Sequence, residues 1–365
     1  MGAPDTIEEV AGTREDVGCA ERALGCDVIR RTKRREGCSE CHVVERRSEP
    51  DLATYAFHLR GRVPRVVPGT APTRRVPYVP MDARILDGRT LATELRDGLT
   101  ARTTALAACG IAPHLRVVMI GEDESSLAYL RGMRTLGAKI GVRVSVDDLG
   151  PACDVATLRE HLIALDADDD VHGVILQQPL PRHLSIRDVA DAVPERKDVD
   201  GTNPLNQGRL AFATGTRFVP ATPGAVMLLL ERSSAWPLRG KDIVVVGRSS
   251  VVGLPVALLA LAQHATVTIV HSATVDIRAR VRAADVVIVA IGKPHAVDAS
   301  WLKTGAVVID VGTTVVDGKL RGDVDFDSAK TVASELTPVP GGVGPVTNVA
   351  LMRNVVTAAE AVVLV

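Results

Sequence analysis

Residues that could bind a phosphate group follow a strand predicted at residues 242–246. The segment Gly247-Arg248-Ser249-Ser250-Val251-Val252-Gly253-Leu254-Pro255 has the spacing G-x-S-x-x-x-G and leads into an apolar, helix-compatible run. One glycine lets the chain turn sharply where the strand ends, and a second lets the helix begin close to a pyrophosphate. The alternative is a structural turn without a ligand. The segment therefore predicts a candidate dinucleotide site.

The end of the next predicted strand distinguishes between the two nicotinamide cofactors. An NAD-selective site usually carries a carboxylate there, which holds the ribose 2′-hydroxyl. Here the sequence is Val270-His271-Ser272-Ala273-Thr274, which contains no carboxylate. A hydroxyl from Ser272 or Thr274, together with the Arg248 guanidinium, would suit a 2′-phosphate. The sequence therefore favours NADP over NAD.

A third candidate segment runs from Thr337 to Thr347 and contains three glycines and three prolines. Proline fixes φ and removes a donor, while glycine permits close approaches that a Cβ would forbid. Pro345 suits the first turn of a helix predicted over residues 349–361. Bare backbone before a helix N-terminus can lie against a flat or anionic ligand, and the alternative is a tight loop between core elements.

Alternating helices and strands must position these segments. The apolar patterns predict helices at 91–108, 125–140, 155–165 and 223–232, and strands at 115–120, 142–149, 171–177, 242–246, 265–270, 286–291 and 306–311, with a polar connection over 197–206. Such alternation indicates parallel sheets with helices on their faces. The second half has the doubly wound pattern of a Rossmann-type domain. The predicted fold class is therefore α/β.

The composition argues against several classes of protein. Hydrophobic residues make up 46% of the chain, the net charge is −1 and aromatic residues are only 2%. These values disfavour a disordered chain, a polyanion binder and a base-stacking surface. No uninterrupted apolar run reaches the roughly 18 residues of a membrane span. Residues 1–10 lack the features of an export signal. We expect a cytoplasmic protein without nucleic-acid or membrane partners.

Residues 1–80 differ from the rest of the chain and predict a poorly structured extension, with Met81 as an alternative start. They contain four of the six cysteines, a basic cluster at residues 30–35 and little apolar periodicity. Cys38-Ser39-Glu40-Cys41-His42 has the C-x-x-C-H spacing of haem attachment, and Cys19 and Cys26 could complete a zinc site. Because neither an export signal nor a supporting fold accompanies them, we expect no metal or haem.

Five motifs occur in one order after the extension. They are Gly173-Val174-Ile175-Leu176-Gln177-Gln178-Pro179-Leu180-Pro181, Lys197-Asp198-Val199-Asp200-Gly201, Pro220-Ala221-Thr222-Pro223, the turn at 247–255 and the loop at 340–347. In identity and order they resemble the bifunctional methylenetetrahydrofolate dehydrogenase/methenyltetrahydrofolate cyclohydrolase family. The resemblance covers about residues 82–364.

The resemblance implies a folate-side α/β domain at residues 81–219, completed by a C-terminal helix at 345–364, and a Rossmann-type NADP domain at 220–344. It implies a cleft between them and a homodimer. It also implies oxidation of 5,10-methylenetetrahydrofolate by hydride transfer to NADP. Hydrolysis of the methenyl product to 10-formyltetrahydrofolate would follow.

The resemblance implies roles for three side chains of the first domain. Tyr129 would stack on the pterin-aminobenzoyl part of the substrate, and Gln177 would hydrogen-bond near the reacting carbon or to its partner on the helix. Asp200 would accept hydrogen bonds from the pterin amino and ring N–H groups. Without the resemblance, these residues read as half-buried packing, a strand-end cap and a turn former. The other predicted binding residues are Gly247, Arg248, Ser249, Val252, Gly253, Ser272, Thr274 and Gly292 for the cofactor, and Pro340, Gly341, Gly342 and Thr347 in the loop beside cofactor and folate.

One position departs from the family pattern in a way that affects the chemistry. The family has a lysine four residues after the tyrosine, where this chain has Met133. Residues i and i+4 share a helix face, so we expect Tyr129 and Met133 both to face the cleft. The resemblance implies that the lysine handles protons during cyclohydrolysis, and methionine carries no titratable proton. We therefore expect a dehydrogenase whose cyclohydrolase activity is weak or lost.

Three alternatives remain open. A fully bifunctional enzyme would keep hydrolysis through water or another lysine. A non-catalytic paralogue would bind NADP or folate without turnover, a reading also motivated by Thr202 and Asn203, where the family usually has an aromatic residue and a histidine. An unrelated oxidoreductase of the amino-acid dehydrogenase kind would share only the Rossmann half.

Overall fold

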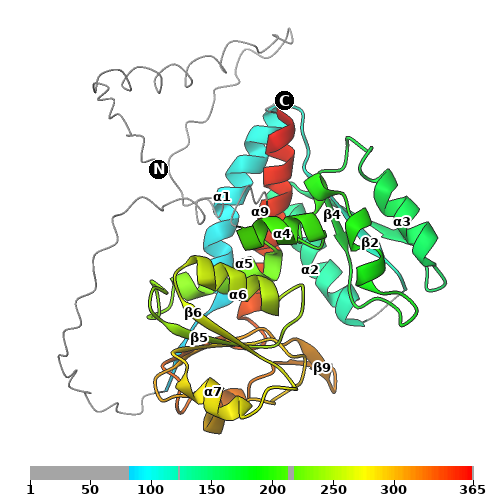
Figure 1. The fold of residues 1–365 in the computed structure, drawn as a ribbon. Coiled ribbons are helices and arrows are strands. Elements are labelled where there is room, and N and C mark those ends of the chain that lie inside the picture. The colour runs from blue at the N-terminus through cyan, green and yellow to red at the C-terminus, as the bar shows by residue number, and fades with distance from the viewer. Residues whose placement is uncertain (1–81, 122–123, 213–217, 364–365) are drawn as a thin grey trace, which may run out of the picture. The chain divides into compact units, whose positions relative to one another are not determined.

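The computed structural model describes residues 82–121, 124–212 and 218–363. The predicted extension at residues 1–80, with its cysteines and basic cluster, lies outside the described residues. Within them the chain forms two parallel sheets with helices packed on their faces (Figure 1). The predicted α/β fold class is therefore confirmed.

The first sheet has three parallel strands in the order β3-β2-β4. Its elements are β2 (His114–Met119), β3 (Arg143–Asp148) and β4 (Gly173–Leu176), with helices α1 (Gly88–Ala108), α2 (Glu124–Ile140) and α3 (Val155–Ala164). Helices α2 and α3 make the crossovers that parallel neighbours require. One face of the sheet packs against apolar side chains of α1, α2 and the C-terminal helix, and the other against α3.

The segment after β4 contains more regular structure than its polar sequence predicts. It forms three short 3₁₀ turns (Ile186–Asp188, Ala190–Ala192 and Glu195–Lys197) and then helix α4 (Pro204–Phe212). The Asn203 side-chain oxygen accepts a hydrogen bond from the Leu205 N–H at 2.8 Å. Pro204 takes the first helical position, where no N–H is needed. The predicted connection over residues 197–206 is therefore wrong from Pro204 onward.

The second sheet has six parallel strands in the order β1-β11-β8-β7-β5-β6. Its strands are β1 (Arg84–Ile85), β5 (Asp242–Val246), β6 (Thr266–Val270), β7 (Val286–Val289), β8 (Val307–Asp310) and β11 (Glu335–Leu336), and the helices around it are α5 (Ala221–Glu231), α6 (Gly253–Ala262), α7 (Ile277–Ala283) and α8 (Phe326–Ala329). The strand order reverses at β5, since β6 lies on one side of it and β7 on the other. Open α/β sheets bind ligands at the carboxyl ends of strands at such a reversal.

Two features of this part of the chain were not predicted, an edge strand without a local signal and a hairpin whose Asp-Gly signal stands in the sequence. β1 pairs with β11 at the edge of the second sheet, although it lies within the predicted folate-side domain. The domain boundaries at residues 81, 219 and 344 stay predictions. Strands β9 (Thr314–Val316) and β10 (Lys319–Arg321) form an antiparallel hairpin. Asp317 and Gly318 turn it with φ of 50° and 69°, as an Asp-Gly hairpin turn requires.

The C-terminal helix α9 (Val343–Val363) packs along α1 and α5 (Figure 1). Among the residues that the structure describes, it alone is long and apolar enough to cross a membrane, and 61% of its most apolar window is buried inside the protein. Val346 joins the core beneath the second sheet, while Leu351 and Val355 join that of the first. Pro345 lies in the first turn, as predicted. Packing into both cores accounts for the apolar character of this helix.

Candidate active site

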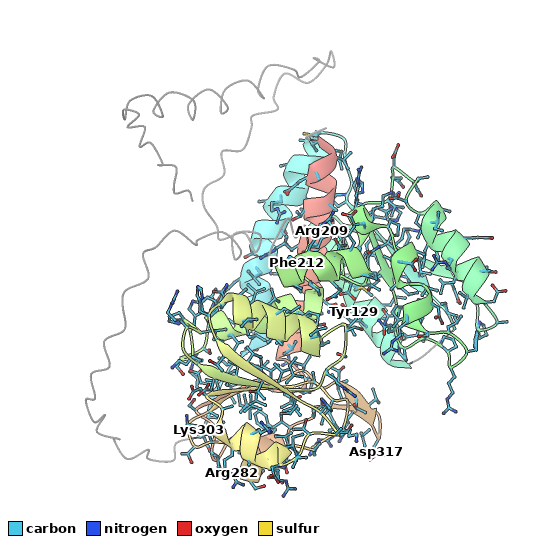
Figure 2. All side chains as sticks on the ribbon, in the orientation of Figure 1. Tyr129, Arg209, Phe212, Arg282, Lys303 and Asp317 are labelled. Atoms are coloured by element: carbon cyan, nitrogen blue, oxygen red, sulfur yellow. The ribbon has the colours of Figure 1, made fainter. Side chains whose placement is uncertain are left out.

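Tyr129 and Asp200 lie close enough for the carboxylate charge to act on the phenol. Tyr129 comes from α2 (Figure 2), and Asp200 follows a bridge that pairs Asp198 with Val174 of β4. Burial, and after it the charge of Asp200, raises the pKa of the Tyr129 hydroxyl. Burial, and after it the charge of Asp198, raises the pKa of Asp200 to about 7. The structure therefore brings these two predicted residues together in a half-buried place.

The turn that carries Asp200 is packed against the start of α5. Gly201 has a φ of 69°, and a Cβ at that position would lie 2.5 Å from the Pro220 ring. The backbone N–H of Ala221, the first residue of α5, opposes the rise in the pKa of Asp200. A carboxylate at a helix N-terminus is also favoured by the helix dipole. The packing of this turn therefore places Asp200 beside the first residue of α5.

Asp198 organises the residues that follow the Asp200 turn. Its buried carboxylate accepts hydrogen bonds from the Thr202 N–H at 2.8 Å, the Asn203 N–H at 2.9 Å and the Asn206 amide at 2.8 Å. Burial raises the pKa of Asp198, and these hydrogen bonds oppose the rise. The Asn203 amide donates in turn to the Val193 carbonyl oxygen at 2.8 Å. Of the two departures from the family pattern, Asn203 thus has a structural role through its side chain, while Thr202 contributes its backbone N–H.

Gln177, at the end of β4, is tied to α2 through a residue that the sequence did not single out. Its amide donates to the Gln178 carbonyl oxygen at 2.8 Å and to the Ser126 hydroxyl at 3.4 Å. Ser126 is buried one turn before Tyr129 and donates to the same carbonyl oxygen at 3.2 Å. Fifty-one positions separate Gln177 from Ser126, so no local pattern predicts their contact. The contact places the Gln177 amide beside the helix that carries Tyr129.

Met133 shares the Tyr129 side of α2, as the helical spacing predicts. Both residues belong to the hydrophobic cluster of the first sheet, with Tyr129 at its partly buried edge. Met133 itself is 0% exposed. The expectation that it faces an open cleft is therefore wrong, because an apolar thioether packs into the core where an ammonium group would seek water.

Gly247 and Gly253 bring α6 close to the end of β5. A Cβ on Gly247 would lie 2.2 Å from the Ala290 oxygen, and one on Gly253 would lie 2.5 Å from the Gly247 oxygen. The Ser249 hydroxyl accepts hydrogen bonds from the Val252 N–H at 3.2 Å and the Gly253 N–H at 3.3 Å. Both glycines are thus required by backbone packing. A role at a pyrophosphate stays a prediction.

The carboxyl ends of β5 and β6 carry the residues predicted for a 2′-phosphate. The side chains of Arg248 and Ser272 are exposed there. Thr274 is partly buried, and its hydroxyl accepts the His271 N–H at 2.9 Å. Beyond β7, Gly292 has a φ of 64°, and a Cβ on it would meet no atom within 4 Å. This edge of the sheet therefore offers a cation, hydroxyls and open space, which fit a dinucleotide that bears an additional phosphate.

The loop from Thr337 to Gly342 is docked on the start of α1. The Gly88 N–H donates to the Gly341 oxygen at 2.9 Å, and a Cβ on Gly88 would lie 1.8 Å from the Gly342 oxygen. Pro340 follows a cis peptide bond. The Thr347 hydroxyl is buried in the first turn of α9 and donates to the Val343 oxygen at 3.1 Å. Contacts of Pro340, Gly341, Gly342 and Thr347 with a substrate stay predictions.

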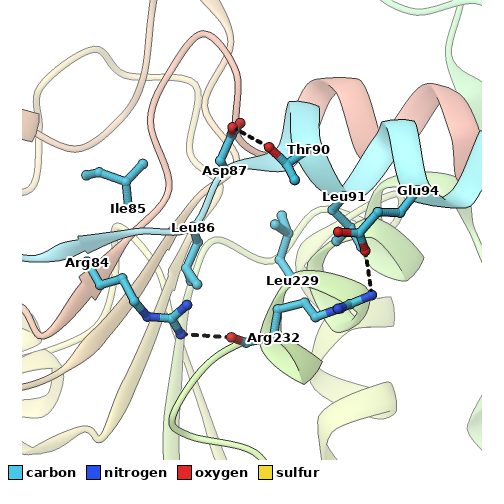
Figure 3. Close-up of a pocket in the computed structure, with 9 residues that line it drawn as sticks. All are labelled: Arg84, Ile85, Leu86, Asp87, Thr90, Leu91, Glu94, Leu229 and Arg232. Carbon is cyan, nitrogen blue, oxygen red and sulfur yellow. Dashed lines mark hydrogen bonds and ion pairs between the residues drawn. The ribbon is translucent and has the colours of Figure 1, made fainter.

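A pocket with a volume of about 360 Å³ lies elsewhere, between β1, α1 and α5 (Figure 3). Its charged groups all have partners: Arg232 pairs with Glu94 at 2.8 Å, Arg84 donates to the Arg232 carbonyl oxygen at 2.8 Å, and Asp87 accepts from the Thr90 hydroxyl at 2.8 Å. None of the predicted site residues lines it. Among the described residues no group of three or more His, Cys, Asp or Glu could hold a metal ion. We therefore do not assign the chemistry to this pocket.

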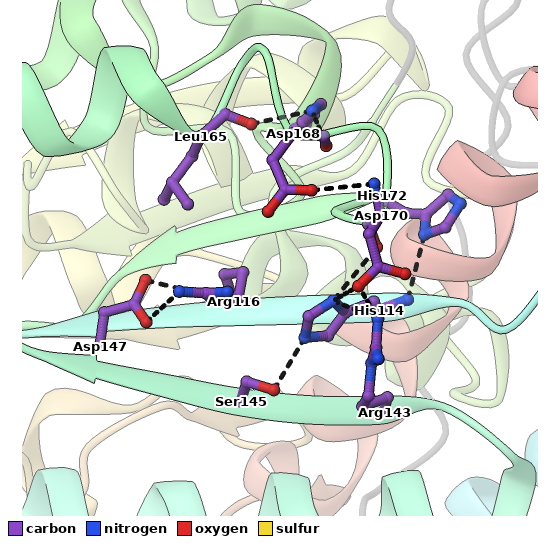
Figure 4. A network of polar contacts seen from close by, with 10 residues as sticks. His114, Arg116, Arg143, Ser145, Asp147, Leu165, Asp168, Asp170 and His172 are labelled. Carbon is purple, nitrogen blue, oxygen red and sulfur yellow. Dashed lines mark hydrogen bonds and ion pairs between the residues drawn. The ribbon is translucent and has the colours of Figure 1, made fainter.

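A polar network around the buried His114, at the amino ends of the strands of the first sheet, has the residue types of a hydrolase triad (Figure 4). His114 Nε2 lies 2.8 Å from the Ser145 hydroxyl, and His114 Nδ1 lies 3.4 Å from an Asp170 carboxylate oxygen. An Arg143 guanidinium nitrogen is 2.9 Å from the same Nδ1. Nδ1 also lies 3.1 Å from the Asp170 carbonyl oxygen, so it faces both an arginine, which can only donate, and a carbonyl group, which can only accept. These contacts join the amino ends of β2, β3 and β4, at the other end of the strands from Gln177, and we assign the network a structural role.

This network predicts a loss of stability in acid. Burial, the largest cause, lowers the pKa of both His114 and His172 below the usual 6.5. The folded state thus disfavours the protonation of both histidines. Their contribution to the free energy of unfolding is therefore complete above about pH 6.5 and is lost as the pH falls below that value. We expect the denaturant midpoint to fall less between pH 7 and pH 5 in His114→Asn than in the wild type. Equal acid dependence in both proteins would contradict this assignment.

Comparisons with known proteins agree with the two halves of the fold. The family described as "Tetrahydrofolate dehydrogenase/cyclohydrolase, catalytic domain" matches residues 86–200, and "Tetrahydrofolate dehydrogenase/cyclohydrolase, NAD(P)-binding domain" matches residues 220–363. The chain is 50% identical over 283 residues to the "Bifunctional protein FolD" of Roseiflexus sp., covering 77% of this chain and 97% of that protein. It is 44% identical over 281 residues to the protein of that name from Bacillus licheniformis, covering 77% and 98%.

A solved structure agrees as well. The Trypanosoma brucei N5,N10-methylenetetrahydrofolate dehydrogenase-cyclohydrolase, complexed with NADP cofactor and inhibitor, is 38% identical with a TM-score of 0.73, over 78% of this chain and 99% of that one. Family matches over both halves, and relatives of this identity over nearly their full length, leave no other assignment. The chain belongs to the tetrahydrofolate dehydrogenase/cyclohydrolase family.

Proposed function

We propose that this protein oxidises 5,10-methylenetetrahydrofolate with NADP and hydrolyses the methenyl product weakly or not at all. The observation that carries the proposal is the fully buried Met133 on the α2 face that holds Tyr129. Relatives with matching sequences are named as bifunctional, which supports the dehydrogenase half. The absence of a titratable group at residue 133 argues against the hydrolase half.

The two reactions place different demands on residue 133. In the first, the methylene carbon loses a hydride with its two electrons and becomes a methenyl cation, while NADP supplies the acceptor. No proton moves, so the protein's task is to hold the carbon in place. Asp200 would hold the pterin edge and Tyr129 would lie against its ring. In the second reaction water adds to the methenyl carbon and a proton must leave, which requires a base.

We infer NADP rather than NAD as the cofactor. Support comes from the exposed Arg248 and Ser272 at the ends of β5 and β6, and from the lack of a carboxylate in the segment at residues 270–274. The match to an NAD(P)-binding domain and the NADP complex of the Trypanosoma relative agree with this choice.

Arg248→Ala should therefore raise the KM for NADP by about 10–100-fold, because a charge-assisted hydrogen bond to phosphate contributes ~1.5–3 kcal/mol. The KM for NAD, which lacks the phosphate, should change little. Steady-state kinetics with both cofactors measure the contrast, and Arg239→Ala, on the loop before β5, is the control. An equal rise for both cofactors would count against a 2′-phosphate contact.

We further propose a homodimer that works in the cytoplasm on tetrahydrofolate derivatives, without nucleic-acid or membrane partners. Phe212 (Figure 2) and Leu205 on α4 are 79% and 52% exposed and offer apolar surface for such an association. Light scattering of the purified protein tests the dimer.

The second candidate function is the complete bifunctional one, and the names of the relatives favour it. It requires a base other than residue 133. The non-catalytic alternative is weakened at residue 203, because the Asn203 side chain has structural contacts with the Val193 oxygen and the Leu205 N–H. Assays of NADP reduction and of methenyl hydrolysis on the purified full chain separate the three.

A further inference from the structure

Two buried carboxylates at the carboxyl end of the second sheet have no part in the function described so far. Asp310 ends β8 and Asp323 follows β10, and they are 3% and 0% exposed. Within the described part of the chain neither forms an ion pair with a basic side chain. A buried carboxylate is costly unless hydrogen bonds compensate it. Their partners therefore show what the two groups hold in place.

Asp323 holds the turn that follows β7. Its Oδ2 atom accepts hydrogen bonds from the Ile291 N–H at 2.7 Å and from the Gly292 N–H at 2.9 Å. Gly292 has a φ of 64°, a conformation that residues other than glycine rarely adopt. Among the described residues the second oxygen, Oδ1, is buried without a hydrogen-bond partner. One oxygen of Asp323 thus binds two consecutive backbone N–H groups at the carboxyl end of the second sheet, where open α/β sheets bind their ligands.

Asp310 connects Asp323 to the loop after β11. Its carboxylate accepts hydrogen bonds from the N–H groups of Gly312 at 2.9 Å, Asp323 at 3.0 Å and Val324 at 3.0 Å. Its own N–H donates to the Thr337 hydroxyl at 2.7 Å. Burial raises the pKa of Asp310 to about 6, and the three N–H donors oppose the rise. At neutral pH the carboxylate is mostly ionised and accepts from all three.

The glycines around Asp310 and Asp323 show that the backbone packs closely against both carboxylates. A Cβ on Gly322 would lie 2.0 Å from Asp310 Oδ2 and 2.9 Å from a Val339 methyl group. A Cβ on Gly312 would lie 2.4 Å from the Asp323 backbone nitrogen. The turn after β7, the end of β8 and the loop at residues 337–339 are therefore packed around the two carboxylates as one unit.

We propose that Asp310 and Asp323 are positioning residues that hold the Ile291–Gly292 turn and the Thr337–Val339 segment in one geometry, against which the nicotinamide end of the cofactor is placed. The turn after β5, which would receive the phosphates, lies against the Ala290 oxygen just before that turn. Hydride transfer demands close alignment of donor and acceptor carbons. The inference rests on the proposed function for the identity of the cofactor.

The test compares NADP with adenosine 2′,5′-bisphosphate, a fragment that keeps the adenosine, the 2′-phosphate and the adjoining 5′-phosphate but lacks the second pyrophosphate group and the nicotinamide riboside. Calorimetry on the purified full chain measures both dissociation constants. In Asp323→Ala we expect NADP to bind at least about tenfold more weakly, since the two hydrogen bonds that hold the Ile291–Gly292 turn are lost, while the fragment binds as in the wild type.

Asp323→Asn is the conservative variant, because its single amide oxygen can accept both N–H groups. We expect it to bind NADP nearly as the wild type does. Asp325→Ala is the matched control: that carboxylate caps α8 by accepting the Ser328 N–H at 3.1 Å and contacts neither loop. It should leave the ratio of the two dissociation constants unchanged. Thr337→Val removes the acceptor of the Asp310 N–H, and should weaken NADP more than the fragment even if Asp323→Ala does not fold.

Three results would overturn the inference: equal loss of both ligands in Asp323→Ala, no loss of either, or a loss in Asp323→Asn as large as in Asp323→Ala. The proposed function can fail separately. If the wild type binds NADP and the fragment but does not oxidise methylenetetrahydrofolate, the function is wrong, and the binding ratios still decide whether the carboxylates position the nicotinamide end.

Discussion

Replacing Met133 with lysine is expected to raise the rate of methenyltetrahydrofolate hydrolysis by about 10²–10⁴-fold, the range that general acid–base catalysis supplies. Lysine has one more heavy atom than methionine along its side chain, so its stem can follow the methionine path and carry the ammonium beyond it. Tyr129 lies at the partly buried edge of the same cluster, so the ammonium group of a lysine at residue 133 can point toward that polar edge. Oxidation of methylenetetrahydrofolate should change much less, because hydride transfer moves no proton.

This substitution should also lower stability, since residue 133 is 0% exposed. A buried ammonium costs several kcal/mol unless it finds partners, so we expect a lower melting temperature in Met133→Lys. Met133→Leu is the control, with similar volume and no titratable group, and its hydrolysis should stay at the wild-type trace. Wild-type hydrolysis at the rate of bifunctional relatives, unaffected in Met133→Ala, would refute the assignment.

Asp200→Asn should lower kcat/KM for methylenetetrahydrofolate by about 10²–10⁴-fold, because two hydrogen bonds to a charged acceptor contribute ~1.5–3 kcal/mol each. An asparagine side chain presents one oxygen and one NH₂ group, and the NH₂ would oppose an N–H of the pterin edge. Asp148→Asn is the control, since Asp148 is exposed at the end of β3 in the same sheet. A loss of less than tenfold would remove Asp200 from the folate site.

The same residue predicts a pH dependence. The pKa of Asp200 is raised to about 7, mainly by burial. Only the ionised carboxylate accepts both N–H groups, so kcat/KM should fall by about tenfold per pH unit below pH 7. A folded-state pKa above the unfolded value of 3.8 also means that Asp200 lowers stability as the pH rises from 3.8 to about 7, and that this loss is complete above pH 7. Asp200→Asn should therefore lose this activity profile and unfold at a higher denaturant concentration than the wild type at pH 8.

Local pattern was sufficient to predict most of the regular structure. The strand at residues 242–246 has the predicted bounds, and the helix expected over 125–140 begins one residue earlier, at Glu124. Helix α4 was missed although its signals, Asn203 and Pro204, stand in the sequence, because the segment around them is polar and lacks an apolar stripe. The two-residue strands β1 and β11 could not be predicted, since their pairing joins residues about 250 positions apart.

The site residues that belong to sequence motifs could be predicted. Contacts that form only through the tertiary fold could not. Tyr129 and Asp200 are brought together as the motifs imply, whereas Ser126 meets Gln177 only through the fold. Met133 was identified from its spacing, but its complete burial depends on side chains from α1 and α9 that no local pattern brings near it. The hydrogen bonds of Asp310 and Asp323 likewise join three separate loops.

The most direct test of the central claim is one progress curve with the purified full chain, methylenetetrahydrofolate and NADP, recording NADPH and the methenyl product together. The account predicts that NADPH forms by turnover and that the methenyl product accumulates in equal amount, decaying only at its spontaneous rate. NADPH formation with conversion of the methenyl product to 10-formyltetrahydrofolate as fast as it forms would contradict the account, as would the absence of NADPH.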